Sequence, residues 1–316
     1  MTEATPSCLC IARICNPKRS KKNKEDEDNG THSEQSPKNS KKHKEGEDNS
    51  LKSHQNLVAS TYRAKFGGHC RDITVTWSKN TIGQDLCVSV GDKENQSSCK
   101  VHLRPWCVWR KRGSKRLRVD ESRSADVLWD LSAAKFCSGP EPRDNYYVAV
   151  VSNNQAVLLL GDMNEAACKA ARVKRSEDDP AVLLSRKEHV LGKRCFATRA
   201  EFGISGQSHE VAIEYQMKGS SEPALFIRID QELVIEVKQL VWKFRGNDTI
   251  YVAGSPVQIL WDVHDWLFSP GLGHGMFLFT PVQNKIDKME CALNSEDGAI
   301  CSPKQFCHML YAWKSD

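Results

Sequence analysis

The chain has 316 residues, of which 39% are hydrophobic, and a formal net charge of +5. It is long enough for one large domain or two small ones, and none of its apolar runs approaches the roughly 18 residues of a transmembrane helix. The start of the chain lacks the apolar core and cleavage site of a secretion signal. We therefore expect an intracellular protein of the cytoplasm, the nucleus or both, whose small positive charge permits an acidic partner without requiring one.

Residues 1–56 are predicted to form a disordered, low-complexity tail rich in Lys, Glu and Asp. Residues 17–25 return as a direct repeat at residues 37–45, and each copy ends in acids and Asn. Because residues 17–50 contain no aromatic or aliphatic side chain, they cannot offset the entropy lost on ordering. The Lys clusters leave a nuclear-import signal and a solvated tail as alternatives. The acids favour the solvated tail, because they cancel most of the positive field.

Cys8, Cys10 and Cys15 lie among apolar residues near the N-terminus. They are candidates for S-palmitoylation, with the basic run behind them as a second membrane signal. The alternative is a disordered tail that happens to hold three thiols. The thirteen cysteines of the chain are scattered rather than paired as Cys-x-x-Cys, which argues against structural zinc and favours free thiols.

From residue 57 onwards the pattern predicts β-strands. Residues 73–77 and 86–90 alternate apolar and polar side chains, whereas residues 146–151 and 156–160 are two continuous apolar runs joined by a short turn. Strands this apolar are expected to be covered on both faces. A helix is predicted at 163–172, with Asp162 as its cap and Pro180 closing the charged segment that follows.

The second half of the chain repeats the pattern of the first, which predicts a tandem duplication. Trp129-Asp130 returns as Trp261-Asp262, and each pair follows a Trp-x-x-x-Gly segment. We assign the first copy to residues 57–162 and the second to 180–281, followed by a polar loop at 283–303 and a last strand at 305–314 that pairs back into the sheet.

The predicted fold of residues 57–316 is all-β: a duplicated antiparallel barrel or sandwich of about fourteen strands, with one short helix between the copies. Residues 233–244 read as one long strand whose apolar face switches near Gln239, as at a β-bulge. Such curvature favours a barrel.

Several longer segments resemble one plant family, the one catalogued as domain of unknown function 868. The segments that carry the resemblance are residues 62–65, 74–77, 79–80, 104–106, 109–111, 127–131, 146–151, 159–162, 185–189, 242–246, 261–271 and 310–314. The match covers residue 57 to the end and leaves the Lys-rich repeat outside. It implies a plant protein and supplies no catalytic residue.

The first group of candidate site residues surrounds the repeated Trp-Asp pairs. Its members are Trp129, Asp130, Trp261, Asp262, His264, Asp265 and Trp266. If residues 261–266 form a strand, Asp262 and His264 share a face and His274 could approach from the next strand, giving metal-compatible chemistry. The alternative is that these polar groups form hydrogen bonds with the backbone at the end of the strand while the aromatic residues enter the core. We favour this alternative and expect no metal or other cofactor.

The second group is a basic hairpin around the turn at residues 113–114. It consists of Arg110, Lys111, Arg112, Lys115, Arg116 and Arg118, with two Trp residues close by. Such a surface suits the phosphates of a nucleic acid or a phospholipid. The alternative is a solvated edge whose charges prevent aggregation between sheets.

No catalytic motif is present: we find no nucleophile elbow, phosphate-binding Gly loop or His-Glu-x-x-His. The hypothesis favoured by the sequence is therefore a non-enzymatic module that binds an unidentified protein partner. One alternative is a barrel that holds a small apolar, lipid-like ligand. A weaker alternative is binding of an anionic surface through the basic hairpin.

Overall fold

The computed structural model describes residues 54–91, 96–106, 108–120, 123–175, 181–202, 207–217, 222–269, 273–282 and 306–315. Most of the predicted tail, with Cys8, Cys10 and Cys15, and the predicted loop at 283–303 lie outside these residues. The first half contains β1 (His54–Phe66), β2 (His69–Lys79), β3 (Gln84–Val90), β4 (Ser97–Leu103), a 3-10 turn (Val108–Lys111), β5 (Arg112–Arg118), β6 (Ser124–Asp130), β7 (Lys135–Phe136), β8 (Pro142–Asp144), β9 (Tyr147–Ser152), β10 (Gln155–Gly161), α1 (Asn164–Ala171) and β11 (Lys174–Arg175).

The second half consists mainly of longer strands. It contains β12 (Val182–Gly192), β13 (Cys195–Glu201), β14 (Ser208–Gln216), β15 (Ala224–Ile229), β16 (Glu232–Val237), β17 (Arg245–Val252), β18 (Ser255–Asp262), α2 (His264–Phe268), β19 (His274–Pro281) and β20 (Cys307–Lys314). The chain is thus all-β with two short helices in its described part. The cysteines in this part form no disulfide with one another, and neither helix is long and apolar enough to cross a membrane.

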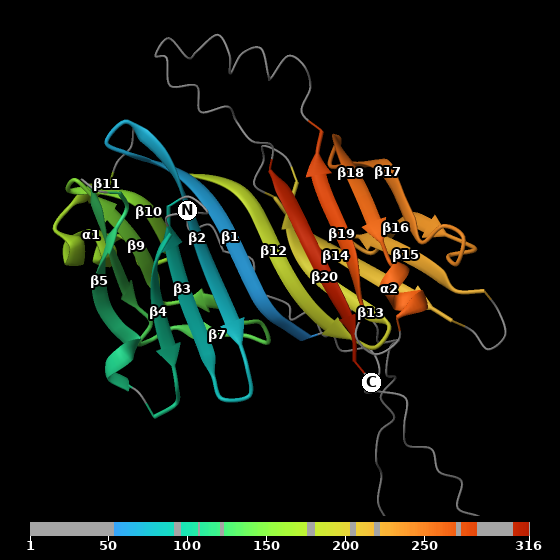
Figure 1. Ribbon diagram of the computed structural model, residues 1–316, viewed down its shortest axis with the longest axis horizontal. Helices are drawn as coiled ribbons and strands as arrows, with labels where there is room; N and C mark the ends of the chain where they lie inside the picture. The colour runs from blue at the N-terminus through green and yellow to red at the C-terminus, as the bar shows by residue number, and fades with distance from the viewer. Residues whose placement is uncertain are drawn as a thin grey trace, which may run out of the picture.

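A nine-stranded sheet runs the length of the molecule in the order β17-β18-β19-β20-β12-β1-β2-β3-β4 (Figure 1). A five-stranded sheet, β11-β10-β9-β6-β5, and a four-stranded sheet, β13-β14-β15-β16, accompany it. Within the described residues none of these sheets closes on itself, because β17 and β4 remain the two ends of the long sheet. The barrel favoured by the sequence is therefore not the observed arrangement.

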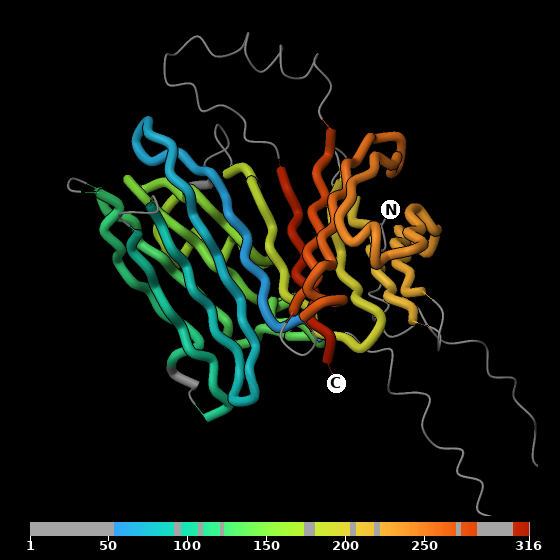
Figure 2. The backbone as a smooth tube through the Cα atoms, turned by 45° about the vertical axis from the view of Figure 1, so that its right-hand side comes forward, coloured from blue at the N-terminus to red at the C-terminus, as the bar shows by residue number. Residues whose placement is uncertain are grey.

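Both smaller sheets pack on the same face of the long sheet. Val58 of β1 pairs with Glu188 of β12, and both are fully buried. Side chains that pair directly across two strands point to one face. On that face Phe66 of β1 enters the core shared with the five-stranded sheet, whereas Val190 of β12 enters the core shared with the four-stranded sheet. The opposite, outer face of the long sheet is turned towards the viewer in Figure 1, and Figure 2 shows the layers from the side.

The predicted central hairpin is observed as β9 and β10. Every residue of β9 is buried, because one of its faces meets the core shared with the long sheet and the other packs against α1 through Tyr147, Ala149 and Ala167. The helix itself lies within the predicted 163–172. Its predicted cap is wrong, however: Asp162 accepts hydrogen bonds from the backbone N–H groups of Asn145 and Tyr146 instead, and none of the described side chains caps α1.

The single long strand predicted at 233–244 is also wrong. β16 ends at Val237, a turn follows, and β17 begins at Arg245 in a different sheet. Gln239, where the apolar face switches, has a φ of 57°. Gln239 lies in the turn between β16 and β17, where its carbonyl accepts the N–H groups of Trp242 and Lys243, so it is outside both strands and does not form a β-bulge. The switch of face therefore marks a crossing between layers.

Candidate interaction surfaces

The repeated Trp residues make equivalent contacts with a glycine and a backbone carbonyl in the two halves of the chain. Trp129 lies over Gly113 and donates its indole N–H to the Arg110 carbonyl at 3.1 Å. Trp261 lies over Gly246 and donates to the Lys243 carbonyl, also at 3.1 Å. A Cβ on either glycine would collide with the indole ring. The repeated Trp-x-x-x-Gly and Trp-Asp segments are thus two parts of one packing unit.

The aspartates that follow these Trp residues hold the end of each strand. Asp130 lies 3.5 Å from the Arg112 guanidinium and accepts the Ser132 backbone N–H at 3.0 Å. The Asp262 carboxylate accepts a hydrogen bond from Arg245 Nε at 2.7 Å and another from the backbone N–H of His264 at 3.0 Å. Both carboxylates therefore have partners within the fold, and a role for them in binding a ligand stays a prediction.

The residues after Asp262 form α2 and not a strand, so the premise of a shared face for Asp262 and His264 is wrong. The spacing of Val263, Trp266 and Leu267 is typical of one face of a helix, and all three side chains pack into the core. Trp266 is 6% exposed and donates its indole N–H to the Ala312 carbonyl at 2.8 Å.

The candidate metal ligands do not come together. His264 contacts Asp265 at 3.1 Å and packs against Phe244 and Phe268. His274 instead stacks on aromatic rings of β20. Across the described ranges, no group of three or more His, Cys, Asp or Glu side chains could hold a metal ion.

The basic hairpin is partly neutralised. The Arg116 guanidinium donates two hydrogen bonds, of 2.8 and 2.9 Å, to the Asp126 carboxylate, and this contact lowers the pKa of the Asp126 carboxyl. Arg112 faces Asp130, and Lys115 donates to the Ser98 carbonyl at 3.1 Å. The other cations, Arg110, Lys111 and Arg118, show no ion pair within the described segments. Half of the predicted anion site therefore has a partner already.

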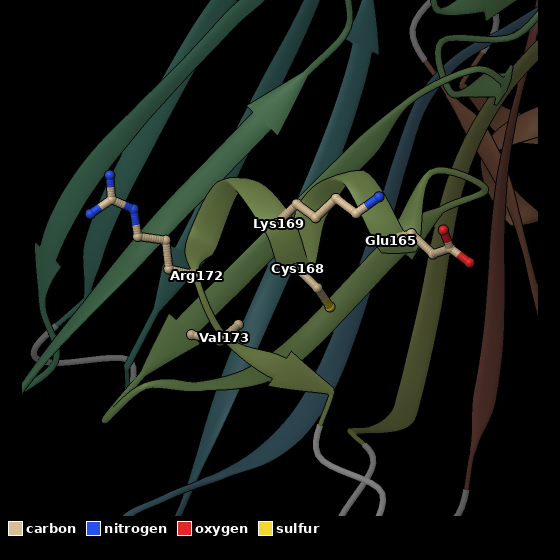
Figure 3. Close-up of a pocket in the computed structure, with 5 residues that line it drawn as sticks. All are labelled: Glu165, Cys168, Lys169, Arg172 and Val173. Atoms are coloured by element: carbon tan, nitrogen blue, oxygen red, sulfur yellow. The ribbon is translucent and has the colours of Figure 1, made fainter.

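A hollow of about 490 Å³ lies beside α1. It is lined by Glu165, Cys168, Lys169, Arg172 and Val173 and is open to solvent. Figure 3 shows that these side chains point in different directions and not towards a common centre. The apolar interiors are instead filled by side chains, including Trp77, Phe196, Phe277 and Phe279, each at most 2% exposed. Neither feature favours an apolar ligand.

A buried polar network, which the sequence did not reveal, lies where the two cores meet. The sequence pattern of residues 185–189 predicts a strand with an exposed polar face, but the Glu188 side chain is 0% exposed. Its carboxylate accepts hydrogen bonds from Arg186 Nε at 2.5 Å, from Gln55 Nε2 at 2.6 Å and from the Thr198 hydroxyl. The donors come from β12, β1 and β13, so one carboxylate joins all three sheet segments.

The network continues through Arg186 and His308. Arg186 also donates to Glu141 at 2.8 Å, and the buried His308 places Nε2 3.5 Å from Glu188, beyond an ordinary hydrogen bond. Burial alone would raise the pKa of Glu188, but Arg186, His308 and Thr198 outweigh it and hold the pKa at about 2. The carboxylate is thus kept ionised, and its partners were invisible in the sequence because they are spread from residue 55 to residue 308.

A cluster of rings lies on the outer face of the long sheet, across three neighbouring strands. His189 of β12, Tyr311 and Trp313 of β20 and His274 of β19 stack with centroids 4.7 to 6.1 Å apart. Lys187 lies over the Tyr311 ring at 4.4 Å. The Nε2 atom of His189 is buried and has no hydrogen-bond partner among the residues that the structure describes. Burial, together with Lys187 and His274, lowers the pKa of this imidazole. We call these five residues the ring cluster.

The ring cluster is the centre of a larger apolar area. Its neighbours in the paired strands point to the same face, namely Leu57, Leu191, Leu260, Met276, Leu278 and Met309. By contrast, the β1–β3 part of this face carries a ladder of small polar residues, with Thr61 and Thr74 hydrogen-bonded at 3.1 Å and Thr76 beside them. The apolar area is therefore local and is not a general property of the face.

Comparison with known proteins gives a family without a function. A family model described as plant protein of unknown function (DUF868) matches residues 53–314. No curated protein matches the chain.

Proposed function

We propose that this chain, which belongs to the DUF868 family of plant proteins, is a non-enzymatic module that binds another protein through the ring cluster and its apolar surround. Aromatic and Met side chains are enriched at the centres of protein interfaces. The outer face offers both types at one place, across β12, β19 and β20. This local concentration of half-buried rings on an otherwise polar face is the observation that carries the proposal.

The packing of the rings indicates the kind of ligand. Tyr311 and Trp313 stack on each other with planes 25° apart, and His274 stacks on Trp313 at 33°. The rings of the cluster meet at angles between 25° and 57°, so they do not form one flat platform on which a sugar or nucleobase could stack. Ring edges and methionine side chains suit the uneven apolar surface of a protein.

We further propose that the two halves are a tandem duplication. β1–β4 form one four-stranded meander and β13–β16 another. Each is followed by four strands in the same spatial order, β10-β9-β6-β5 in the first half and β20-β19-β18-β17 in the second. The matching Trp contacts described above support the same correspondence.

A photo-crosslinking experiment tests the proposed function. Benzoylphenylalanine is placed at Tyr311 in one variant and at Thr76 in a matched control, and both are expressed in plant cells. We expect a discrete crosslinked protein from position 311 and none from position 76, which lies on the polar part of the same face. Equal crosslinking at both positions, or none at position 311, would overturn the proposal.

A further inference from the structure

The positive charge of the chain is concentrated at one corner of the molecule. Residues 97–130, which run from β4 to β6, hold nine Lys or Arg and four Asp or Glu, a balance equal to the +5 of the whole chain. The matching strands of the second half, β16 to β18 at residues 232–262, hold three Lys or Arg and four Asp or Glu. The architecture common to the two halves therefore does not require these cations.

The edges of two sheets meet at this corner. In the described part of the chain, β4 ends the nine-stranded sheet and β5 ends the five-stranded sheet, and Lys115 of β5 donates to the Ser98 carbonyl of β4 at 3.1 Å. The ion pairs of the hairpin lie at its surface, since the Arg112 and Arg116 side chains are 69% and 73% exposed. Exposed ion pairs are weak, so an anionic surface can compete with their carboxylates for the two guanidinium groups.

Two large apolar side chains protrude from neighbouring loops of this corner. Trp106, between β4 and β5, is 64% exposed, and Ile82, in the turn between β2 and β3, is 56% exposed. The two loops lie side by side, because Gln84 pairs with Leu103 and its carbonyl accepts a hydrogen bond from Arg104 at 3.2 Å. Both loops are at the lower end of the long sheet in Figure 1.

The backbone of the loop that carries Trp106 is fixed by contacts with β6. The Arg110 carbonyl accepts the indole N–H of Trp129 at 3.1 Å, and the Lys111 carbonyl accepts the backbone N–H of Leu131 at 2.7 Å. The loop therefore presents two cations and an exposed indole ring without having to become ordered first. Such preorganisation lowers the entropy cost of binding.

We propose that this corner binds the surface of a bilayer that contains anionic phospholipid, with Trp106 and Ile82 inserted among the headgroups and the hairpin cations facing the phosphates. Trp side chains favour the headgroup region of a bilayer, and cations beside an anionic leaflet add to the affinity. Apolar side chains next to Lys and Arg are typical of surfaces that lie on a membrane.

Other anionic partners fit the corner less well. Proteins that bind single-stranded nucleic acid stack successive bases on aromatic rings, whereas the neighbour of Trp106 is the aliphatic Ile82. Lys is depleted at the centres of protein interfaces, whereas here it lies beside the apolar side chains. The proposal is independent of the proposed function, which uses the outer face of β12, β19 and β20.

Co-sedimentation of the full-length chain with vesicles tests the proposal. The vesicles are phosphatidylcholine alone or phosphatidylcholine mixed with phosphatidylserine. We expect binding to the mixed vesicles that weakens as salt is raised, and little binding to phosphatidylcholine alone. Trp106→Ala should weaken binding to the mixed vesicles about tenfold. Every variant keeps the same N-terminal tail, so the charge of the tail cannot account for a difference between variants.

Tyr251→Ala is the matched control. It removes an aromatic side chain that is 75% exposed, from the opposite edge of the long sheet, and should bind as wild type does. Trp106→Phe tests insertion separately, because it keeps an apolar ring but removes the indole. It should bind more tightly than Trp106→Ala and lose the blue shift of tryptophan fluorescence that we expect when wild type meets the mixed vesicles.

Other outcomes overturn the proposal. These are equal binding of wild type and Trp106→Ala, binding that does not depend on phosphatidylserine, or no binding to either kind of vesicle. A wild-type chain that binds a single-stranded RNA oligonucleotide but not the vesicles would assign the corner to nucleic acid instead. Crosslinking at position 311 does not involve this corner, so each of the two proposals can fail while the other stands.

Discussion

Replacing Glu188 with Gln should destabilise the fold more than almost any other conservative change. The substitution keeps the shape of the side chain but removes the charge that Arg186, Gln55 and Thr198 surround. Removing one partner of a buried ion pair leaves the other uncompensated, which typically costs about 3–5 kcal/mol. Arg186 keeps its contact with Glu141, so we expect the lower end of that range.

The pKa of Glu188 indicates a loss of stability of the same size. A folded-state pKa of about 2, against an ordinary value of 4.5, favours the ionised form in the folded protein by about 3 kcal/mol, at about 1.36 kcal/mol per pKa unit. Because the folded pKa is depressed, this contribution is complete above pH 4.5 and is lost as the pH falls from 4.5 towards 2. By the same relation less than half of this contribution remains at pH 3.

Urea unfolding of the full-length chain, followed by tryptophan fluorescence, checks both numbers. The free energy of unfolding of Glu188→Gln should lie about 3 kcal/mol below wild type at pH 7, and the gap should shrink to less than half at pH 3. Glu165→Gln on the exposed side of α1 is the matched control and should change little at either pH. A gap below about 1 kcal/mol at pH 7, or one that does not vary with pH, would refute the reasoning.

Three further predictions concern other contacts. Gly246→Ala should lower the free energy of unfolding by about 1–3 kcal/mol, because the added Cβ would collide with the Trp261 ring. Gly113→Ala should lower it by less, because its Cβ approaches the Trp129 ring less closely. Thermal unfolding of the two variants tests this order. Trp266→Phe should cost about 1–2 kcal/mol in urea unfolding, because the Ala312 carbonyl loses its donor. Charge reversal at Arg112, Lys115 and Arg116 should abolish any salt-dependent binding to anionic vesicles; binding that persists contradicts a role for the basic hairpin.

Local patterns in the sequence were sufficient for much of the strand content. The alternation of Ile73, Val75 and Trp77 marks the buried face of β2, and all three are at most 2% exposed. The recurrence of Trp129 and Trp261 likewise predicted matching environments, which the glycine contacts explain. These features depend on neighbours in sequence or on a single adjacent strand, so a pattern can carry them.

Features that depend on distant pairing were out of reach. Glu188 carries a charge on an alternating strand, so its pattern indicates an exposed face, and only the meeting of β1, β12, β13 and β20 makes it buried. The ring cluster is similar, since His189 and Tyr311 become neighbours only because β12 and β20 pair in parallel. Neither the order of the strands nor the side on which a sheet packs is written in local periodicity.

The parallel pairing of β20 with β12 bears on how the protein is synthesised. β20 lies between β19 and β12 and joins the two halves of the long sheet, and it follows every other described strand in sequence. A growing chain therefore cannot complete this sheet before residues 307–314 have been synthesised. Until then, β12 and β19 each keep one unpaired side, and such edges promote association between nascent chains. A premature stop before residue 307 would make that exposure permanent and should yield aggregated protein.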